Sequence, residues 1–397
     1  MKSLCLGLLF SLSIFTLKAQ SDTAVFRSVA ATIQKKYAPD KRSVYFNLEL
    51  TGDSAKLEST SQEALKEFDK LKPNTPSIKF SGVLLPEPSL HGMEYGVANL
   101  SVCNNRAYPK NAAEMMTQML LGTPIKVFKK HGGFYLVQTP DGYISWTDVG
   151  AITPMNKSGF ETWQRAKKVV FTADYGHSFN TPDENAQRVS DLVGGNILQL
   201  LGEEKKFYKV GYPDGRTAYL PKRQASLYQA WVTRPDPNAE KILTTAQSLL
   251  GVPYLWGGTS GKGVDCSGFT KMSFFLNGVI IPRDASQQAL IGQPVDVLEN
   301  DSISVDKCLR NLQPGDLLFF SAAKRRGFND GRVTHTAIYM GKGEFIQAAG
   351  MVRINSLVPS ADNYDGRQSA TLVGARRILT DIGKPGITRI DQHYWYK

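Results

Sequence analysis

Cysteine is scarce in this sequence, with four residues among 397. Cys5 lies in an N-terminal apolar run, and the other three, Cys103, Cys266 and Cys308, form no Cys-x-x-Cys pair. Because structural zinc sites usually take thiolates from such pairs, the spacing argues against a zinc site. Beyond the apolar run the number of cysteines is odd, so an oxidising compartment leaves at least one thiol unpaired. One of the three is therefore a candidate nucleophile.

Long apolar runs are also rare, since only residues 4–17 form one. A single run excludes a multi-span membrane protein. Lys2 precedes the run and Lys18-Ala19-Gln20 follow it, which is the order found in a secretory signal peptide. We expect residues 1–20 to be this signal and the protein to be exported, either to the periplasm or to the medium. An uncleaved membrane anchor is the alternative.

Acidic side chains are fewer than basic ones, 36 against 47, which gives a formal net charge of +11. A basic surface favours an anionic partner, and composition alone does not choose among nucleic acid, lipid headgroups and an acidic cell-wall polymer. Hydrophobic residues make up 42% and charged residues 21%, as in globular proteins, which excludes a disordered or fibrous chain. The length predicts about two to four domains.

Residues 21–90 have mixed patterns and no chemical motif. Apolar spacing predicts a helix over residues 23–36, a strand over 44–50 and a second helix over 62–71. The role of this segment stays open.

An internal repeat follows. Residues 134–146 and 207–219 each read as a strand, a Pro-Asp-Gly turn and a second strand, and six of the 13 positions are identical. Gly122 and Gly195 have the same separation. A further strand is expected before each hairpin, at residues 125–128 and 197–200. Short hairpins in units of this size predict small β-barrels, which we place at residues 91–155 and 160–232. The pattern resembles bacterial SH3-like domains, which often target enzymes to the cell wall.

Cys266 lies where a glycine-rich loop gives way to a helix. Apolar residues after it have helical spacing, Asn277-Gly278 is a stop signal, and Asp265 is the expected N-cap. The N–H groups and partial positive charge of a helix N-terminus favour a thiolate, so we expect a lowered pKa for Cys266. A P-loop is excluded because Gly263 follows Lys262 where Ser or Thr is required. A cysteine that merely packs in the core is the alternative.

A thiolate nucleophile needs a proton-transfer partner. Of the five histidines, only His335 lies in the domain that holds Cys266, apart from one in the C-terminal tail. His335 opens a strand, residues 341–343 form a turn, and Gln347 lies on the returning strand. This register puts both side chains on one face of the hairpin, where Gln347 can orient the imidazole. The alternatives are a surface histidine and an amide at the edge of the core.

Three further residues are candidates in the same domain. Tyr254 can donate its hydroxyl to a developing oxyanion. Arg283 offers a guanidinium for a substrate carboxylate, and Asp284 offers a carboxylate for an amine. Turn packing is the alternative for Tyr254, and a surface ion pair is the alternative for the other two. The residues imply neither a metal nor an organic cofactor.

Four motifs occur in order in this domain: Tyr-x-Trp-Gly-Gly at 254–258, Asp-Cys-Ser-Gly-Phe at 265–269, Pro-Gly-Asp-Leu-Leu-Phe-Phe at 314–320, and His-Thr-Ala-Ile-Tyr-Met-Gly at 335–341 with Phe-Ile-Gln-Ala at 345–348. Their order and spacing resemble the NlpC-type cysteine peptidases of the bacterial cell wall. The order of signal peptide, two SH3-like modules and peptidase is similar to the dipeptidyl-peptidase VI type. Enzymes of that type cut the γ-D-glutamyl bond to the diamino acid in wall peptides with a free N-terminal L-alanine.

The resemblance implies roles for individual residues. Cys266 is the nucleophile, His335 is the base and Tyr254 is the oxyanion-side tyrosine. Gln347 stands where many members have a second histidine, which puts the third role in question. The first SH3-like module of such relatives closes over the free amine with an acid and a hydroxyl. The implied substrate contacts are Asp265, Ser267, Arg283 and Asp284, with Glu114 and Tyr143 from the first module.

We therefore predict an α+β chain in which two small SH3-like β-barrels and a mixed N-terminal segment precede a papain-like NlpC-type catalytic domain at 238–380. The predicted function is that of an exported, monomeric cysteine endopeptidase acting on peptidoglycan stem peptides or murein fragments. We expect no cofactor, no nucleic-acid partner and no integral membrane domain. An amidase or acyltransferase on the same core is one alternative. A wall-binding adaptor without catalysis is the other.

Overall fold

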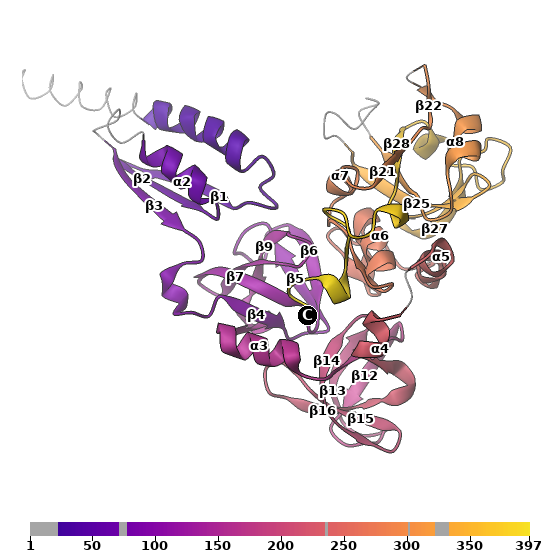
Figure 1. Ribbon diagram of the computed structural model, residues 1–397, viewed down its shortest axis with the longest axis horizontal. Coiled ribbons are helices and arrows are strands. Elements are labelled where there is room, and N and C mark those ends of the chain that lie inside the picture. The colour runs from indigo at the N-terminus through magenta and orange to yellow at the C-terminus, as the bar shows by residue number, and fades with distance from the viewer. Residues whose placement is uncertain (1–22, 71–77, 235–236, 301, 322–332) are drawn as a thin grey trace, which may run out of the picture. The chain divides into compact units, whose positions relative to one another are not determined.

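The computed structural model describes residues 23–70, 78–234, 237–300, 302–321 and 333–397 (Figure 1). The expected signal at residues 1–20 lies outside these ranges. The chain divides into two compact units, Met1–Gly92 with Phe128–Lys130, and Met93–Val127 with His131–Lys397. Within the described ranges, no helix is long and apolar enough to cross a membrane.

The first unit has a small sheet with helices. Residues 23–37 are helical, and they are followed by β1 (Phe46–Thr51), β2 (Ser54–Ser59), α2 (Gln62–Asp69), β3 (Lys79–Leu84) and the 3-10 turn η2 (Pro88–Leu90). Strand β2 pairs antiparallel with β1 and parallel with β3. Phenylalanines from the helices and strands meet in its core, at positions 26, 46, 68 and 80. The three elements expected over residues 23–71 are confirmed, with ends that differ by one or two residues.

Two copies of one β module follow. The first contains β4 (Tyr95–Ala98), β5 (Val102–Arg106), β6 (Met115–Leu120), β7 (Pro124–His131), β8 (Phe134–Gln138), β9 (Ile144–Asp148) and β10 (Ile152–Met155). The second contains β11 (Lys168–Phe171), β12 (Tyr175–Phe179), β13 (Arg188–Val193), β14 (Ile197–Glu204), β15 (Phe207–Gly211), β16 (Thr217–Pro221) and β17 (Ala225–Leu227). Short helices end the copies: η3 (Val149–Ala151) and α3 (Lys157–Arg165), then η4 (Lys222–Gln224) and α4 (Tyr228–Val232).

The two copies have the same topology. The strand order β6-β5-β9-β8-β7-β4-β10 of the first sheet matches β13-β12-β16-β15-β14-β11-β17 of the second, strand for strand. The Pro-Asp-Gly turns place Gly142 and Gly215 at φ of 81° and 90°, a region that glycine enters without steric cost. The repeat noticed in one hairpin therefore extends over the whole module.

The last part of the chain has a six-stranded antiparallel sheet. Its order is β21 (Gln293–Val295), β28 (Leu372–Arg377), β24 (Leu317–Phe320), β25 (His335–Gly341), β26 (Glu344–Ala349) and β27 (Met351–Ser356). Helix α6 (Cys266–Phe275) packs against β25 and β26, and α5 (Ala239–Ser248) packs against α6. The remaining short elements are β18 (Thr259–Ser260), β19 (Gly263–Val264), β20 (Val279–Ile280), α7 (Ala285–Gln288), β22 (Leu298–Glu299), β23 (Ser302–Ile303), α8 (Val305–Asn311) and α9 (Gly366–Ser369).

The helix starts follow the sequence expectations. Asn238 caps α5 and Asp265 caps α6, since each side chain accepts a hydrogen bond from the backbone N–H three residues on. Nine of the ten residues of α6 are buried, so this helix is the centre of the core. A core cluster on each side of the sheet holds the strands in place.

The chain continues to pack beyond residue 380, where the predicted catalytic domain ends. It forms η5 (Leu379–Asp381), β29 (Thr388–Arg389), which pairs with β20, and η6 (Ile390–Gln392). Trp395 then packs against a cluster formed by Val97, Phe160 and Trp163. The last residues therefore return to the first β module.

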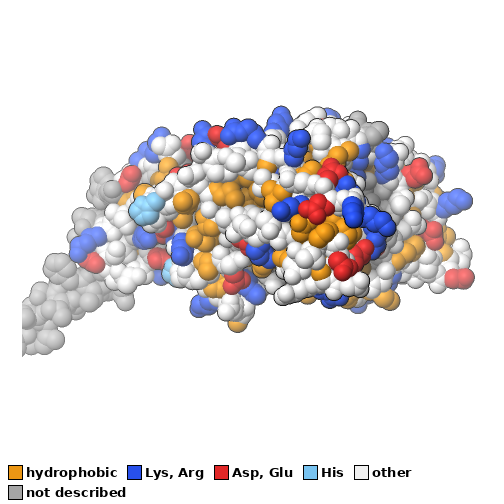
Figure 2. Space-filling model, turned by 90° about the horizontal axis from the view of Figure 1, so that it is seen from below, with side chains coloured by type: hydrophobic (Ala, Val, Ile, Leu, Met, Phe, Trp, Pro, Cys, Tyr) orange, Lys and Arg blue, Asp and Glu red, His pale blue; other side chains and the backbone are white. Residues whose placement is uncertain are grey.

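Charge is dispersed on the face that Figure 2 shows. Lys and Arg side chains alternate there with Asp and Glu, and apolar side chains lie among them.

Candidate active site

Cys266 is the first residue of α6 and is 6% exposed. Its neighbours explain the Asp-Cys-Ser-Gly sequence. Asp265 accepts from the Gly268 N–H at 2.7 Å and from the Gly257 N–H at 2.9 Å, which fixes the loop to the helix. A Cβ atom at Gly268 would lie 2.0 Å from the carbonyl oxygen of Gly258, so only glycine allows this approach.

The resting thiol is not activated in the way the sequence predicts. Burial raises the pKa of Cys266 to about 11, and the Asp265 carboxylate adds to the rise. Hydrogen bonds from the backbone of Thr336 and Ser267 act in the opposite direction but do not compensate. The expectation of a lowered pKa was wrong for this state because desolvation and the capping carboxylate outweigh the helix N-terminus.

His335 and Gln347 face each other, as the hairpin register predicts. His335 Nε2 lies 2.7 Å from Gln347 Oε1. Gln347 is fully buried, and its Nε2 donates to Asn355 Oδ1 at 2.9 Å and to Asp365 Oδ2 at 3.4 Å. The amide is thus fixed on both sides, so it holds the imidazole in one orientation.

The imidazole is neutral in the resting state. Burial lowers the pKa of His335, although Gln347 and Asp365 oppose the shift. The residue after His335 contacts Cys266, since the backbone N–H of Thr336 donates toward the thiol. A neutral imidazole can accept the proton of a neutral thiol as the sulfur attacks, and in such a pair the thiolate forms only when substrate is present.

Tyr254 lies near the same sulfur. Burial raises its pKa, and the negative charges that Cys266 and Asp265 can carry raise it further. The hydroxyl therefore stays protonated and can donate a hydrogen bond to an oxyanion.

Arg283 is not displayed in the way its sequence context suggests. Its side chain is 1% exposed, so it is neither a surface ion pair nor a guanidinium presented to a ligand. It donates to both carboxylate oxygens of Asp265, at 3.1 and 2.6 Å, and to Ser267 Oγ at 2.9 Å. Its Nε donates to Thr117 Oγ1 at 2.9 Å. Arg283 therefore ties the Cys266 loop to strand β6, because burying this charge requires full pairing.

Two residues of the first β module meet the catalytic part of the chain beside this network. Tyr143 donates to Asp284 Oδ2 at 3.2 Å. Glu114 accepts from the indole N–H of Trp256 at 2.9 Å, and Trp256 is 60% exposed. The acid Glu114 thus contacts the loop that precedes Cys266, whereas the hydroxyl of Tyr143, a residue that is 1% exposed, contacts Asp284 at the start of α7.

Sequence reasoning missed the partners that hold the module here. Thr117 accepts from Arg283, and Gln118 bonds Thr259 twice, at 2.9 Å each. Lys271 forms an ion pair with Asp141. No local signal marks these pairs, because their members are far apart in the sequence. Among the described residues, no group of three or more His, Cys, Asp or Glu is placed to hold a metal ion.

Comparison with known proteins bears on this site. Residues 251–371 match the model of the NlpC/P60 family, and residues 105–152 match that of the bacterial dipeptidyl-peptidase Sh3 domain. A γ-D-glutamyl-L-lysine dipeptidyl-peptidase of Bacillus cereus is 31% identical over 283 residues, which are 68% of this chain and 77% of that protein. The chain belongs to the NlpC/P60 family of cysteine peptidases.

Other NlpC/P60 relatives agree. Dipeptidyl-peptidase 6 of Lysinibacillus sphaericus is 29% identical over 64% of this chain and 89% of its own length. A crystal structure of an NlpC/P60 family protein from Bacillus cereus aligns with a TM-score of 0.59 and 26% identity, covering 72% of this chain and 99% of that one. These likenesses establish the α+β fold with an SH3-like module before the NlpC/P60 domain.

Proposed function

We propose that this protein is an exported, monomeric cysteine endopeptidase that cleaves peptidoglycan-derived peptides. The bond that it cuts is the one between γ-D-glutamate and an L-diamino acid, in peptides with a free N-terminal L-alanine. The relatives named for this type of reaction support the substrate class. The apolar run at residues 4–17 supports export.

In the proposed reaction, His335 accepts the thiol proton as Cys266 Sγ attacks the γ-carbonyl carbon. Tyr254 and N–H groups at the start of α6 stabilise the oxyanion. The imidazolium then gives its proton to the departing amine of the diamino acid, and a thioester remains. Water, deprotonated by His335, attacks the thioester and restores the thiol, so L-Ala-γ-D-Glu is released.

The free amine would bind at the edge of the first β module. Glu114 supplies a carboxylate for an ammonium group, and Asp284 supplies a second one beside the Tyr143 hydroxyl. The two contacts, Glu114 with Trp256 and Tyr143 with Asp284, join the first module to the part of the chain that holds Cys266. They are the observation that carries the proposal, because carboxylates recognise a cationic chain end.

The test compares L-Ala-γ-D-Glu-L-Lys with its N-acetylated form, with products identified by mass spectrometry. We expect release of L-Ala-γ-D-Glu from the free peptide and little turnover of the blocked one. Glu114→Gln should reduce this discrimination. Equal cleavage of both peptides would remove the free-amine specificity, and acyl transfer to an added amine without hydrolysis would favour the transferase alternative. Binding to sacculi with no cleavage of any stem peptide would favour the adaptor.

A further inference from the structure

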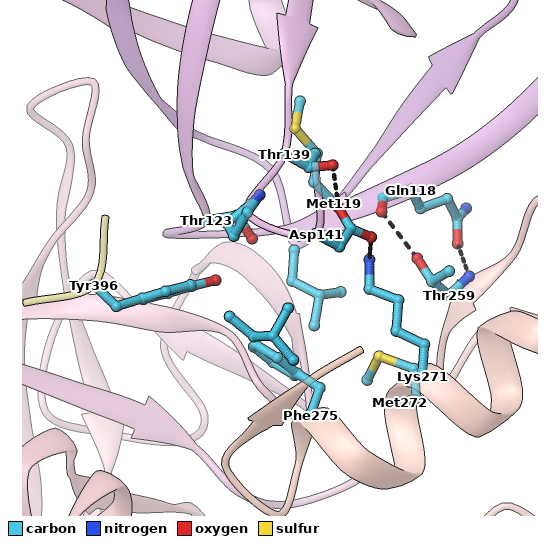
Figure 3. Close-up of a pocket in the computed structure, with 13 residues that line it drawn as sticks. Gln118, Met119, Thr123, Thr139, Asp141, Thr259, Lys271, Met272, Phe275 and Tyr396 are labelled. Atoms are coloured by element: carbon cyan, nitrogen blue, oxygen red, sulfur yellow. Dashed lines mark hydrogen bonds and ion pairs between the residues drawn. The ribbon is translucent and has the colours of Figure 1, made fainter. Parts of the chain in front are cut away.

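A buried ion pair joins the first β module to the helix that begins with Cys266. Lys271 Nζ of α6 lies 2.5 Å from Asp141 Oδ2, and the side chains are 15% and 1% exposed. The Thr139 hydroxyl donates to the other oxygen of the same carboxylate. Figure 3 shows this group at the wall of a cavity of about 40 Å³ between the module and α6. Burial raises the pKa of Asp141, but Lys271 and Thr139 outweigh it, so the net shift is downward and the carboxylate stays charged.

The C-terminal tail holds the same turn from another side. His393 Nε2 lies 3.0 Å from the Pro140 carbonyl oxygen. Gln164 of α3 donates to the carbonyls of Tyr394 and Trp395 at 3.1 Å, which anchors the tail to the module. Tyr396 is partly buried and lines the cavity in Figure 3. Residues 139–143 are therefore fixed by both α6 and the tail.

The second β module shows what this turn needs for its own folding. Its equivalent of Asp141 is Asp214, which is exposed and pairs with Arg216 inside the turn, at 2.8 Å. Strands β15 and β16 nevertheless pair in the same register as β8 and β9. A charged partner on α6 is thus unnecessary for forming the hairpin, although Arg216 of this turn also donates to the Asn99 carbonyl of the first module at 3.1 Å. The buried pair in the first copy has another consequence.

The buried pair of Lys271 and Asp141 bears on the position of Tyr143. Tyr143 ends the 139–143 turn and bonds Asp284. Ser267 and Lys271 are four residues apart and so lie on one face of α6. Ser267 accepts a hydrogen bond from Arg283, and Lys271 donates to Asp141, its one acidic partner among the ion pairs formed by the described residues. The same helix therefore sets the place of the nucleophile and of the turn that carries Tyr143.

We propose that Lys271 and His393 are positioning residues that hold the 139–143 turn, and with it Tyr143, at a fixed distance from Cys266. This inference rests on the proposed function, because it assigns to the turn the task of setting how many residues fit between the amine and the scissile bond. Lys271 and His393 act through Tyr143 and touch no substrate themselves.

The experiment uses the full-length protein with Lys271→Met, His393→Ala and the double variant Asp141→Asn/Lys271→Met, which leaves no buried charge unpaired. For the free peptide we expect KM to rise about 10- to 100-fold with a smaller change in kcat, since misplacement of a contact by an ångström has costs of this order. For N-acetylated peptide, kcat/KM should stay unchanged. Lys271→Arg should restore most of the discrimination, and Asp214→Asn is the matched control in the second copy.

Hydrogen exchange of residues 139–143 gives a second readout that does not depend on the substrate. Exchange there should become faster in Lys271→Met and His393→Ala and remain slow around Cys266. Unchanged exchange, or an equal loss of activity on both peptides, would overturn the positioning role. If the wild-type protein does not discriminate between the peptides, the proposed amine specificity fails, and the exchange result alone then decides whether Lys271 and His393 hold the turn.

Discussion

His335 and Gln347 are joined by a 2.7 Å hydrogen bond between Nε2 and Oε1 across one β-hairpin. An amide in this place orients the ring without adding charge to it. Gln347 raises the pKa of His335 through this hydrogen bond, and Asp365, which bonds the far side of Gln347, raises it further. Gln347 thus orients the base and raises its pKa through the hydrogen bond, and Asp365 adds the negative charge.

Gln347 offers the first prediction. Gln347→Ala removes an interaction that raises the pKa of His335, so the acidic limb of kcat/KM should move to lower pH while kcat falls by about 10-fold or more. Gln347→Glu places a negative charge beside the ring, so the same limb should move to higher pH. The pH profiles of the three proteins check both signs. Profiles that coincide would show that Gln347 has no part in orienting the base.

The second prediction concerns the pH dependence of the wild-type protein. Because burial lowers the pKa of His335 below its ordinary value of 6.5, the base is available at mildly acidic pH. The acidic limb of kcat/KM should therefore have its midpoint below 6.5. A midpoint well above that value, in a rate measured at low substrate concentration, contradicts a neutral resting pair.

The third prediction concerns the nucleophile. Cys266→Ala should lower turnover of stem peptides at least about 1,000-fold, because no other group supplies the thioester. Cys308→Ala is the matched control, since Cys308 is also buried and unpaired but lies in α8. Circular dichroism should be the same for both. Comparable residual activity in the two variants would exclude Cys266 as the nucleophile.

The fourth prediction concerns the buried network around Asp265. Arg283→Met leaves this carboxylate buried without its cation, so the free energy of unfolding should fall by about 3–5 kcal/mol. Thermal unfolding measures the loss. The Asp265→Asn/Arg283→Met double variant removes both charges and should recover part of it. A single variant as stable as the wild type would mean that water reaches Asp265.

The fifth prediction concerns the contact between Gly257 and β6. Gly257 has φ of 77°, and a Cβ atom there would lie 2.6 Å from the Met115 carbonyl oxygen. Gly257→Ala should therefore displace the module and raise KM for the free peptide. Gly215→Ala has the same kind of backbone strain, about 1–3 kcal/mol, but no atom within 4 Å of the added Cβ. Similar KM values in both variants would show that strain alone accounts for the effect.

Sequence patterns over a few neighbouring residues predicted those parts of the site that depend on helix caps, helix spacing and strand register. The cap at Asp265, the helix after Cys266 and the shared face of His335 and Gln347 follow from spacing along the chain. The 13-residue repeat and the strand before each copy of it indicated the module, whereas the similarity of the other strands in the two copies was not noticed in the sequence. Hydrogen bonds between residues far apart in the sequence could not be predicted in this way. Arg283 looked like a ligand-binding group, and only its buried partners reveal that it holds the residues on either side of Cys266.

The direction of the Cys266 pKa shift could not be read from the sequence for a related reason. A helix N-terminus is a local feature, whereas desolvation depends on everything that covers the thiol. The contact of the C-terminal tail could not be predicted either, since no sequence pattern near His393 indicates that it contacts Pro140.

The duplicated module has one more consequence. At the positions of Glu114 and Tyr143, the second copy carries Gln187 and Arg216, although both copies share one strand order. The two copies thus share one architecture, whereas the residues that we propose for amine binding occur in the first copy. A few substitutions in the first copy can therefore change the substrate selectivity while the strand order that both copies share is preserved.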